Sequence, residues 1–398
     1  MERGNNWKKK LTFEEQYKLE MRFLEENLTE LVDQTTEKVH MIKVIYPGGY
    51  RPPLDAKKPS KIPSQIGRYL VDREIGCGGY GVVYSAFDPQ DRTNIVAIKR
   101  FAHCENKTES SEKVHPSISR EATLREMYNN ITLTHPNIAK FKEMLHSDEA
   151  DYLVMSFYAR CLTSLIGPKE NVTVSEVMLR SLFKGLLEGL KYIHDKNMMH
   201  RDLKPENIML KDAYTPIIID LGLCRECGVV PDKLFSNEIQ TPGYRPPEIV
   251  IGTKQYGQSV DIWSLGIIFL EVLFSERLVP PKKDLDETKE DEMNMLVQLL
   301  KHFHGKVPIP ESFSNKLPGY RKFEEKYSQD GFGPENYIFK KSLPPFATNL
   351  LKRMLHIDPK QRITAEDALK HPFISPSAHP PSPFSSSQTS IITVTDTE

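Results

Sequence analysis

The polar stretch at residues 200–207 reads His-Arg-Asp-Leu-Lys-Pro-Glu-Asn and lies between two apolar segments. An aspartate such as Asp202 can orient a hydroxyl group and accept its proton, and Asn207, five positions later, can offer an oxygen to a metal ion. Lys204 can neutralise charge on a phosphoryl group in transfer. The alternative is a surface loop whose Asp and Asn side chains only form turns. The spacing favours phosphoryl transfer.

A second carboxylate follows an apolar run. Residues 217–219 are all isoleucine, and Asp220 comes directly after them, followed by Leu221 and Gly222. A carboxylate at the end of a buried strand is suited to chelating Mg²⁺ that bridges the β- and γ-phosphates of a nucleotide. The predicted metal ligands are therefore Asn207 and Asp220.

Residues 76–81 form a Gly-x-Gly-x-x-Gly stretch, in which the missing side chains let backbone amides approach a polyphosphate. In a dinucleotide-binding domain this stretch would open a helix. Here residues 82–84 read as a strand, so a glycine-rich hairpin fits better. A tight β-turn without a ligand is the alternative. Lys99 lies on the next predicted strand and can reach phosphates if a carboxylate holds its ammonium group.

Two kinds of scaffold must position these side chains. Residues 69–99 contain short β-branched and aromatic runs between turns, which predicts an antiparallel meander. A single helix around residues 124–131 and a strand pair ending at residues 152–155 follow. After Pro168 the apolar pattern becomes helical and continues to His371. We expect an α+β protein, with a small β-rich unit carrying one helix and a larger, mainly helical unit.

The composition excludes several classes of protein. The chain has 398 residues with 53 Lys and Arg against 54 Asp and Glu, so no global field draws it onto nucleic acid or acidic lipid. Five cysteines, an odd number, argue against a secreted disulfide framework. No window reaches the roughly 18 unbroken apolar residues of a membrane span, and no signal-peptide core follows Met1. We expect an intracellular protein, nuclear or cytoplasmic, with no direct nucleic-acid or membrane partner.

Taken in order, the motifs resemble those of the eukaryotic protein kinases over residues 69–374. The resemblance implies a bilobal protein kinase fold with ATP and Mg²⁺ in the cleft. It implies a kinase domain over 65–374, divided into an N-lobe at 65–155, a hinge at 156–158 and a C-lobe at 159–374. Residues 1–64 are then an N-terminal extension, a helical segment plus a Pro-rich linker, and residues 375–398 are a disordered Ser/Thr/Pro tail.

The resemblance also assigns roles to single residues. The carboxylate that holds Lys99 is predicted to be Glu126, nine positions before the His-Pro-Asn at residues 135–137, with Glu121 as the alternative. The implied catalytic set is Asp202, Lys204, Asn207, Lys99 and Glu126. The residues implied to bind ATP are Ile75, Gly76, Cys77, Gly78, Gly79, Tyr80, Gly81, Val83, Ala97, Lys99, Ser156 and Tyr158.

Within the family, the glycine loop looks like that of the cyclin-dependent kinases. It includes Tyr80, where a phosphate would repel the phosphates of ATP. Ser236 stands twelve positions before Glu248, where these kinases carry an activating phosphothreonine. The positions that would gather this phosphate are held by Arg125, Arg201 and Arg225. Independent surface arginines are the alternative. The implied partners are protein substrates and a cyclin or cyclin-like activator.

The implied activity is ATP-dependent transfer of the γ-phosphate to Ser or Thr of proteins, supported by Lys204. Arg245 matches the proline-directed architecture of the wider cyclin-dependent and mitogen-activated group, which predicts a Ser/Thr-Pro preference. Three neighbours depart from that pattern, because residues usually apolar or aromatic are replaced by Gln240, Pro242 and Gly243.

Two further departures, Leu221 for Phe and Pro246 for Ala, remove no catalytic group. Glu248 is expected to form a buried ion pair with Arg362. Cys224 and Cys227 have the spacing of a redox pair or half a zinc site, but no second pair stands nearby. The alternative functions are a pseudokinase acting as a binding scaffold and, on the same fold, a small-molecule kinase.

Overall fold

The computed structural model describes residues 39–41, 43–45, 58–78, 81–102, 120–167, 174–227, 240–278, 289–304, 309–311, 313, 316–328 and 345–376. These residues belong to two compact units. The first comprises the described residues up to Tyr158 together with Asp220–Cys224. The second comprises the described residues of Ala159–Ile219 and those from Arg225 onward.

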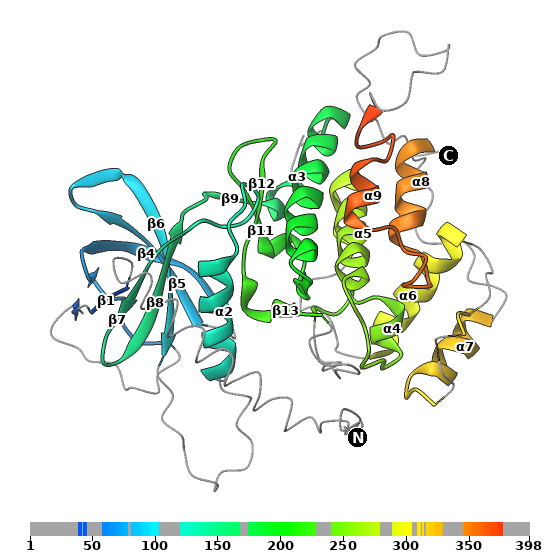
Figure 1. Ribbon diagram of the computed structural model, residues 1–398, viewed down its shortest axis with the longest axis horizontal. Coiled ribbons are helices and arrows are strands. Elements are labelled where there is room, and N and C mark those ends of the chain that lie inside the picture. The colour runs from blue at the N-terminus through cyan, green and yellow to red at the C-terminus, as the bar shows by residue number, and fades with distance from the viewer. Residues whose placement is uncertain are drawn as a thin grey trace, which may run out of the picture. The chain divides into compact units, whose positions relative to one another are not determined.

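The first unit is built on a sheet whose described strands run in the order β1-β7-β8-β6-β5-β4-β3-β2 (Figure 1). All neighbouring pairs are antiparallel except β1 and β7, which are parallel. Its elements are β1 (Val39–Met41), β2 (Val44–Ile45), β3 (Gln65–Ile66), β4 (Tyr69–Gly78), β5 (Gly81–Asp88), β6 (Asp91–Ala102), α2 (Arg120–Thr132), β7 (Phe141–His146), β8 (Ala150–Ser156) and the short 3₁₀ helix η5 (Leu221–Leu223).

The predicted meander is confirmed as β4, β5 and β6. Side chains alternate between the two faces of a strand, so Val96 and Ile98 of β6 enter one core while Lys99 and Phe101 share the other face. Phe101 packs there against Met127 of α2. The strand period therefore points Lys99 toward the face of the sheet that α2 covers.

Two strands of this sheet come from the predicted N-terminal extension. β1 pairs with β7 and β2 pairs with β3, although the sequence predicted only a helical segment and a linker there. Strands of two or three residues are too short to show an alternating pattern, so no sequence signal predicts them. The expected helical segment and the tail after Pro376 lie outside the described residues.

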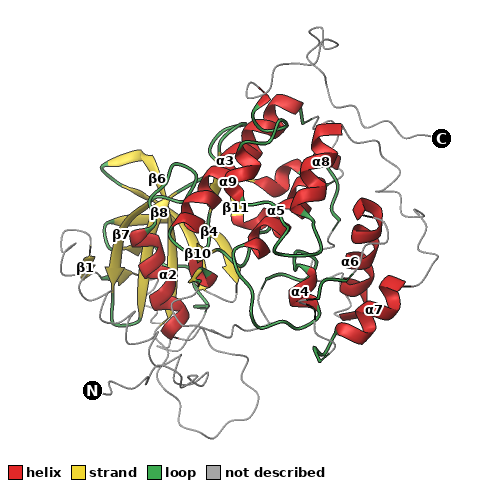
Figure 2. Ribbon diagram, turned by 45° about the vertical axis from the view of Figure 1, so that its right-hand side comes forward, coloured by secondary structure: helices red, strands yellow, loops and turns green. Residues whose placement is uncertain are grey.

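The second unit is mainly helical, as Figure 2 shows by its predominance of red ribbons. Its helices are α3 (Glu176–Asp195), α4 (Pro247–Val250), α5 (Ser259–Phe274), α6 (Lys289–His304), α7 (Tyr320–Ser328), α8 (Pro345–Met354) and α9 (Ala365–Leu369), with the 3₁₀ turns η3 (Leu162–Leu165) and η4 (Pro205–Asn207). Its short strands are β9 (Arg160–Cys161), β10 (Met198–Met199), β11 (Ile208–Leu210), β12 (Pro216–Ile218) and β13 (Arg225–Glu226).

The core of this unit is formed around α3 and α5. Ser175 precedes α3, and its side chain accepts a hydrogen bond from the Met178 N–H and caps the helix. α5 is apolar on nearly all sides and is buried from Val260 to Phe274, as expected for a helix at the centre of a core. The rings of Phe183 and Phe269 join the two helices, with centroids 4.4 Å apart.

The expected ion pair between Glu248 and Arg362 is present and buried. Arg362 donates from Nη1 and Nη2 to the two carboxylate oxygens of Glu248 at 2.8 and 3.0 Å. Its guanidinium carbon also lies 5.2 Å from the centroid of the Trp263 ring. The pair fastens α4 to the segment that leads into α9. No helix among the described residues is long and apolar enough to cross a membrane.

Candidate active site

The backbone of residues 200–202 is held by one buried carboxylate, Asp261 of α5. Asp261 accepts hydrogen bonds from the backbone N–H groups of His200 and Arg201, both at 2.8 Å, and its Oδ2 lies 3.0 Å from His194 Nε2. Burial alone raises the pKa of the Asp261 carboxyl, but His194, His200 and the Arg201 N–H outweigh burial and hold the pKa below its usual value. The ionised carboxylate fixes Arg201 at a φ of 67°, a left-handed conformation that non-glycine residues rarely adopt.

Asp202 follows this anchored turn, and both of its oxygens are engaged. Oδ2 accepts from Lys204 Nζ at 2.8 Å and from Asn207 Nδ2 at 3.0 Å. Oδ1 accepts from the backbone N–H of Thr241 at 3.2 Å and from its hydroxyl at 3.1 Å. The structure therefore brings the predicted residues Asp202, Lys204 and Asn207 together.

Thr241 is a site residue that sequence reasoning missed. Lys204 Nζ donates to its Oγ1 at 2.9 Å, so Thr241 joins the lysine to the aspartate. Threonine has no distinctive signal in sequence.

Asn207 is held from both sides. Its Nδ2 donates to the backbone oxygen of Asp202 at 2.8 Å as well as to the carboxylate. Its own backbone oxygen accepts from the Ile219 N–H at 3.0 Å. Because both amide hydrogens are used within the loop, Oδ1 is the atom left to act as a metal ligand.

In the first unit, the buried side chains of Lys99 and Glu126 form a cluster with the partly exposed Asp220. Lys99 Nζ donates to Glu126 Oε1 and lies 3.2 Å from Asp220 Oδ1. The Lys99 and Glu126 side chains are 9% and 2% exposed, whereas Asp220 keeps 25% of its side-chain surface open. Of the two carboxylates that the sequence left open, Glu126 is the one that pairs with Lys99. The side chain of Glu121 lies outside the described residues.

The charges of this cluster shift the protonation of its members. Burial lowers the pKa of Lys99, but Asp220 and Glu126 outweigh burial and raise it above its ordinary value. Burial also raises the pKa of Glu126, and with the negative charge of Asp220 brings it to about 7 despite the opposing effect of Lys99. Two carboxylates share one ammonium group, so the cluster retains a proton that free carboxylates would release.

The glycine stretch forms the predicted hairpin between β4 and β5. Gly76 pairs with Val83, Cys77 with Val82, and Gly78 with Gly81. Gly81 has a φ of 129°, and a Cβ there would lie 2.2 Å from the backbone oxygen of Arg100, so only glycine fits. Ile75 precedes the stretch and is 40% exposed. Gly79 and Tyr80 lie outside the described residues.

The remaining residues expected to bind ATP lie on or near β6 and β8. Ala97 pairs across the strands with Met155, and the Ser156 N–H donates to the Lys140 backbone oxygen at 3.0 Å. Burial raises the pKa of the Tyr158 hydroxyl. Among the described cysteines, Cys77, Cys161, Cys224 and Cys227 are free thiols, and no metal-binding group of three His, Cys, Asp or Glu side chains occurs in the described part of the chain.

Two of the three expected phosphate-binding arginines lie near one residue in the second unit. Arg201 Nη1 lies 3.4 Å from the Tyr256 hydroxyl, and both Arg201 and Arg225 lower the pKa of that hydroxyl, although burial outweighs them and raises it. Arg125 is buried on α2 of the first unit. Ser236, the expected phosphorylation site, lies outside the described residues.

Hydrogen bonds and an ion pair hold residues 240–245 in place. Gln240 has a φ of 61°, and its backbone oxygen accepts from Arg245 Nε at 3.2 Å. Glu292 of α6 accepts from the Gly243 N–H at 3.1 Å and from Arg245 Nη1 at 3.2 Å. Gln240 Nε2 donates to Ser264 Oγ at 2.9 Å. The sequence indicated Arg245 but not Glu292, which is 47 positions away.

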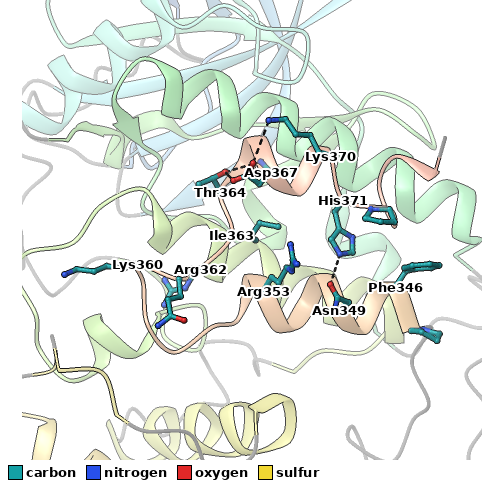
Figure 3. Close-up of a pocket in the computed structure, with 13 residues that line it drawn as sticks. Phe346, Asn349, Arg353, Lys360, Arg362, Ile363, Thr364, Asp367, Lys370 and His371 are labelled. Atoms are coloured by element: carbon teal, nitrogen blue, oxygen red, sulfur yellow. Dashed lines mark hydrogen bonds and ion pairs between the residues drawn. The ribbon is translucent and has the colours of Figure 1, made fainter. Parts of the chain in front are cut away.

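A hollow in the second unit is lined by residues between Pro345 and Pro372 (Figure 3). Asn349 of α8 and His371 point toward each other across it, joined by a 2.9 Å hydrogen bond. Arg353 and the exposed Phe346 also line it. It contains none of the predicted catalytic or nucleotide-binding residues, and we assign it no function.

Residues 69–374 match a family model described as protein kinase domain. The matched segment starts at the first residue of β4 and ends shortly after α9, so it contains every site residue discussed above.

Proposed function

The chain belongs to the protein kinase family and has its α+β bilobal fold, and from this premise we propose that it is a catalytically active serine/threonine kinase, most similar to the cyclin-dependent kinases. The observation that carries the proposal is the hydrogen-bonded group formed by Asp202, Lys204, Asn207 and Thr241. The proposed kinase domain spans residues 65–374.

The proposed catalytic step is proton acceptance by Asp202. Asp202 is fixed by contacts to both oxygens, so it needs little reorganisation to orient a substrate hydroxyl and take up its proton. Lys204 lies between Asp202 and Thr241, where its charge can neutralise the phosphoryl group in transfer. This arrangement uses the chain's own residues for orientation, proton transfer and charge neutralisation.

ATP and Mg²⁺ are the proposed cofactors. Bound ATP supplies the phosphoryl group that is transferred, and Mg²⁺ neutralises its phosphates. The residues fit these groups: Lys99 is charged and fixed, Asp220 keeps exposed surface for a metal, and the carboxamide oxygen of Asn207 is left as a ligand. The hairpin of β4 and β5 would present its backbone amides to the phosphates.

The geometry of Gln240 supports a preference for proline after the phosphorylated residue. Its backbone oxygen already accepts from Arg245, so a substrate N–H beside it would have to compete with the guanidinium group for this acceptor. An unsatisfied N–H costs free energy, and proline has no N–H to leave unpaired. Thr241, which joins Lys204 to Asp202, and Lys204 itself support the assignment to serine and threonine substrates.

Regulation by phosphate is part of the proposal. Phosphate on Ser236 would be gathered by Arg125, Arg201 and Arg225 and would activate the kinase, whereas phosphate on Tyr80 would oppose ATP binding. A cyclin or cyclin-like protein is the proposed activating partner, and we place the kinase in the nucleus or the cytoplasm. Ser236→Ala with undiminished activity under activating conditions would contradict the first point.

The alternative is a pseudokinase that acts as a binding scaffold. It is disfavoured because Lys99, Asp202 and Asp220 are all retained. The test is ³²P transfer from Mg-ATP to a mixed peptide library, with Lys99→Met as the matched inactive variant. We expect transfer by the wild type and at most a few per cent of it by Lys99→Met. Equal ³²P incorporation by the wild type and Lys99→Met would contradict the proposed activity and favour the pseudokinase scaffold.

A further inference from the structure

Helix α2 carries two consecutive buried asparagines. Asn129 and Asn130 are 1% and 2% exposed. A primary amide buried at this level must find hydrogen-bond partners, because an unpaired one costs free energy. The two residues therefore provide a natural comparison between neighbouring side chains of the same type.

Their partners differ. Asn130 Nδ2 donates to the backbone oxygen of Glu126 at 2.8 Å, within its own helix. Asn129 Nδ2 donates to the backbone oxygens of Leu221 and Cys224 at 2.9 and 3.1 Å, more than 90 positions along the chain. Both partners of Asn129 are acceptors, so its amide nitrogen, and not its amide oxygen, makes these contacts.

The segment that Asn129 holds begins directly after Asp220. Leu221 opens the 3₁₀ turn η5 and Cys224 caps it, so the two bonded carbonyls mark the ends of this turn. Asp220 itself has a φ of 60°, a left-handed conformation that surrounding contacts must maintain. The turn also packs closely on α2, since a Cβ on Gly222 would lie 2.9 Å from Glu126 Oε2.

Asn129 and Glu126 lie on the same helix, three positions apart, and thus on one face. Glu126 holds Lys99, and Lys99 lies 3.2 Å from Asp220 Oδ1. The chain therefore closes a ring of contacts from α2 through Lys99 to Asp220 and back to α2 through Asn129.

We propose that Asn129 is a positioning residue that fixes Asp220 relative to Glu126 and Lys99. Its amide holds both ends of the turn after Asp220 and so keeps the carboxylate in one place. The structural part of the proposal stands on these contacts alone. Its catalytic part, that Asn129 lowers the Mg²⁺ concentration the enzyme needs, rests on the proposed kinase function.

The test compares Asn129→Leu with Asn130→Leu, two substitutions of the same kind at adjacent buried positions. Two lost hydrogen bonds predict an increase of about tenfold in amide hydrogen exchange over residues 221–225 for Asn129→Leu. The same variant should raise the Mg²⁺ concentration for half-maximal phosphotransfer about tenfold, with the KM for peptide within about twofold of wild type. Asn130→Leu should stay within about twofold of wild type in all three.

Equal behaviour of the two variants in exchange and in Mg²⁺ requirement would overturn the proposal. Asn129→Ala removes the amide without adding bulk and replaces Asn129→Leu if that protein does not fold. The exchange measurement needs no activity. A wild type without phosphotransfer would therefore count against the proposed function, and the exchange comparison would still decide whether Asn129 holds the turn.

Discussion

At the scale of single residues, the charges of Lys99, Glu126 and Asp220 set which members of the cluster carry a proton. Burial and the charge of Asp220 raise the pKa of Glu126, and although burial lowers the pKa of Lys99, the two carboxylates raise it. A metal ion beside Asp220 would compensate the same negative charge and favour release of the extra proton. The cluster is therefore sensitive to pH in the neutral range.

The first prediction is a pH dependence assigned to Glu126. Its pKa of about 7 means that the carboxyl becomes neutral as the pH falls below that value and then no longer pairs with Lys99. We expect kcat/KM for ATP, which reports the free enzyme, to rise with pH through about 7. Glu126→Gln should lower the rate and flatten this step. An unchanged step in Glu126→Gln would assign the titration to another group.

The second prediction concerns Thr241, the residue without a sequence signal. Thr241→Val keeps the shape but removes the hydroxyl that joins Lys204 to Asp202. We expect kcat to fall about tenfold or more, since bonds to charged groups are lost. Thr132→Val is the control, because its hydroxyl donates to the Tyr128 backbone oxygen of its own helix, far in sequence from Asp202. Equal kcat values for the two variants would show that Thr241 has no part in orienting Asp202.

At the scale of elements, ion pairs and hydrogen bonds of the second unit hold the turn at residues 200–202 and the segments around it. Asp261 at the start of α5 holds residues 200 and 201, and Arg362 fastens α4 through Glu248. Glu292 of α6 holds Gly243 and Arg245. Each of these three contacts uses a buried or nearly buried charged side chain whose polar atoms have hydrogen-bond partners. Such partners are needed because an unpaired charge in low-dielectric surroundings is costly in free energy.

The third prediction measures one of these anchors. Glu248→Gln leaves the Arg362 charge buried without its carboxylate, which should destabilise the second unit by about 3–5 kcal/mol. Urea unfolding followed by circular dichroism would show a lower midpoint with an unchanged m-value. Glu366→Gln, which breaks the exposed pair with Lys370, should leave the midpoint in place. Equal midpoints for the two variants would contradict the anchoring role.

The elements were predicted well where their periodic patterns are long. Apolar spacing predicted the meander of β4, β5 and β6 and the helices α2 and α3. Such spacing is a property of neighbouring residues, so it can be recognised in the sequence alone. β1 and β2 were missed because strands of two or three residues carry no period. Glu292 and Asn129 were missed for a different reason: their partners lie far away in sequence, and only tertiary packing brings them together.

At the scale of the whole molecule, the proposed preference for proline depends on residues 240–245, a segment held by residues distant in sequence. Arg245 occupies the Gln240 oxygen, and Glu292 holds Arg245 in place. The sequence indicated the arginine through its resemblance to a kinase group. The left-handed backbone conformation of Gln240, which directs that oxygen, could not be predicted from the sequence and is seen only in the structure.

The fourth prediction follows from this arrangement. Arg245→Ala frees the Gln240 oxygen to accept a substrate N–H, so the ratio of kcat/KM for Ser-Pro over Ser-Ala peptides should fall about tenfold. Arg277→Ala is the control, because Arg277 pairs with Glu206 instead of occupying the Gln240 oxygen. A ratio that is the same in both variants would remove the proposed basis of the proline preference.

The central claim is that Asp202 supports transfer of the γ-phosphate of ATP to serine or threonine. The most direct measurement is the steady-state rate of purified wild type and Asp202→Asn with Mg-ATP and matched Ser, Thr and Tyr peptides. We predict phosphorylation of the Ser and Thr peptides by the wild type and a fall in kcat of about 100- to 10,000-fold in Asp202→Asn. Equal rates for the two proteins, or transfer to the Tyr peptide alone, would contradict the account.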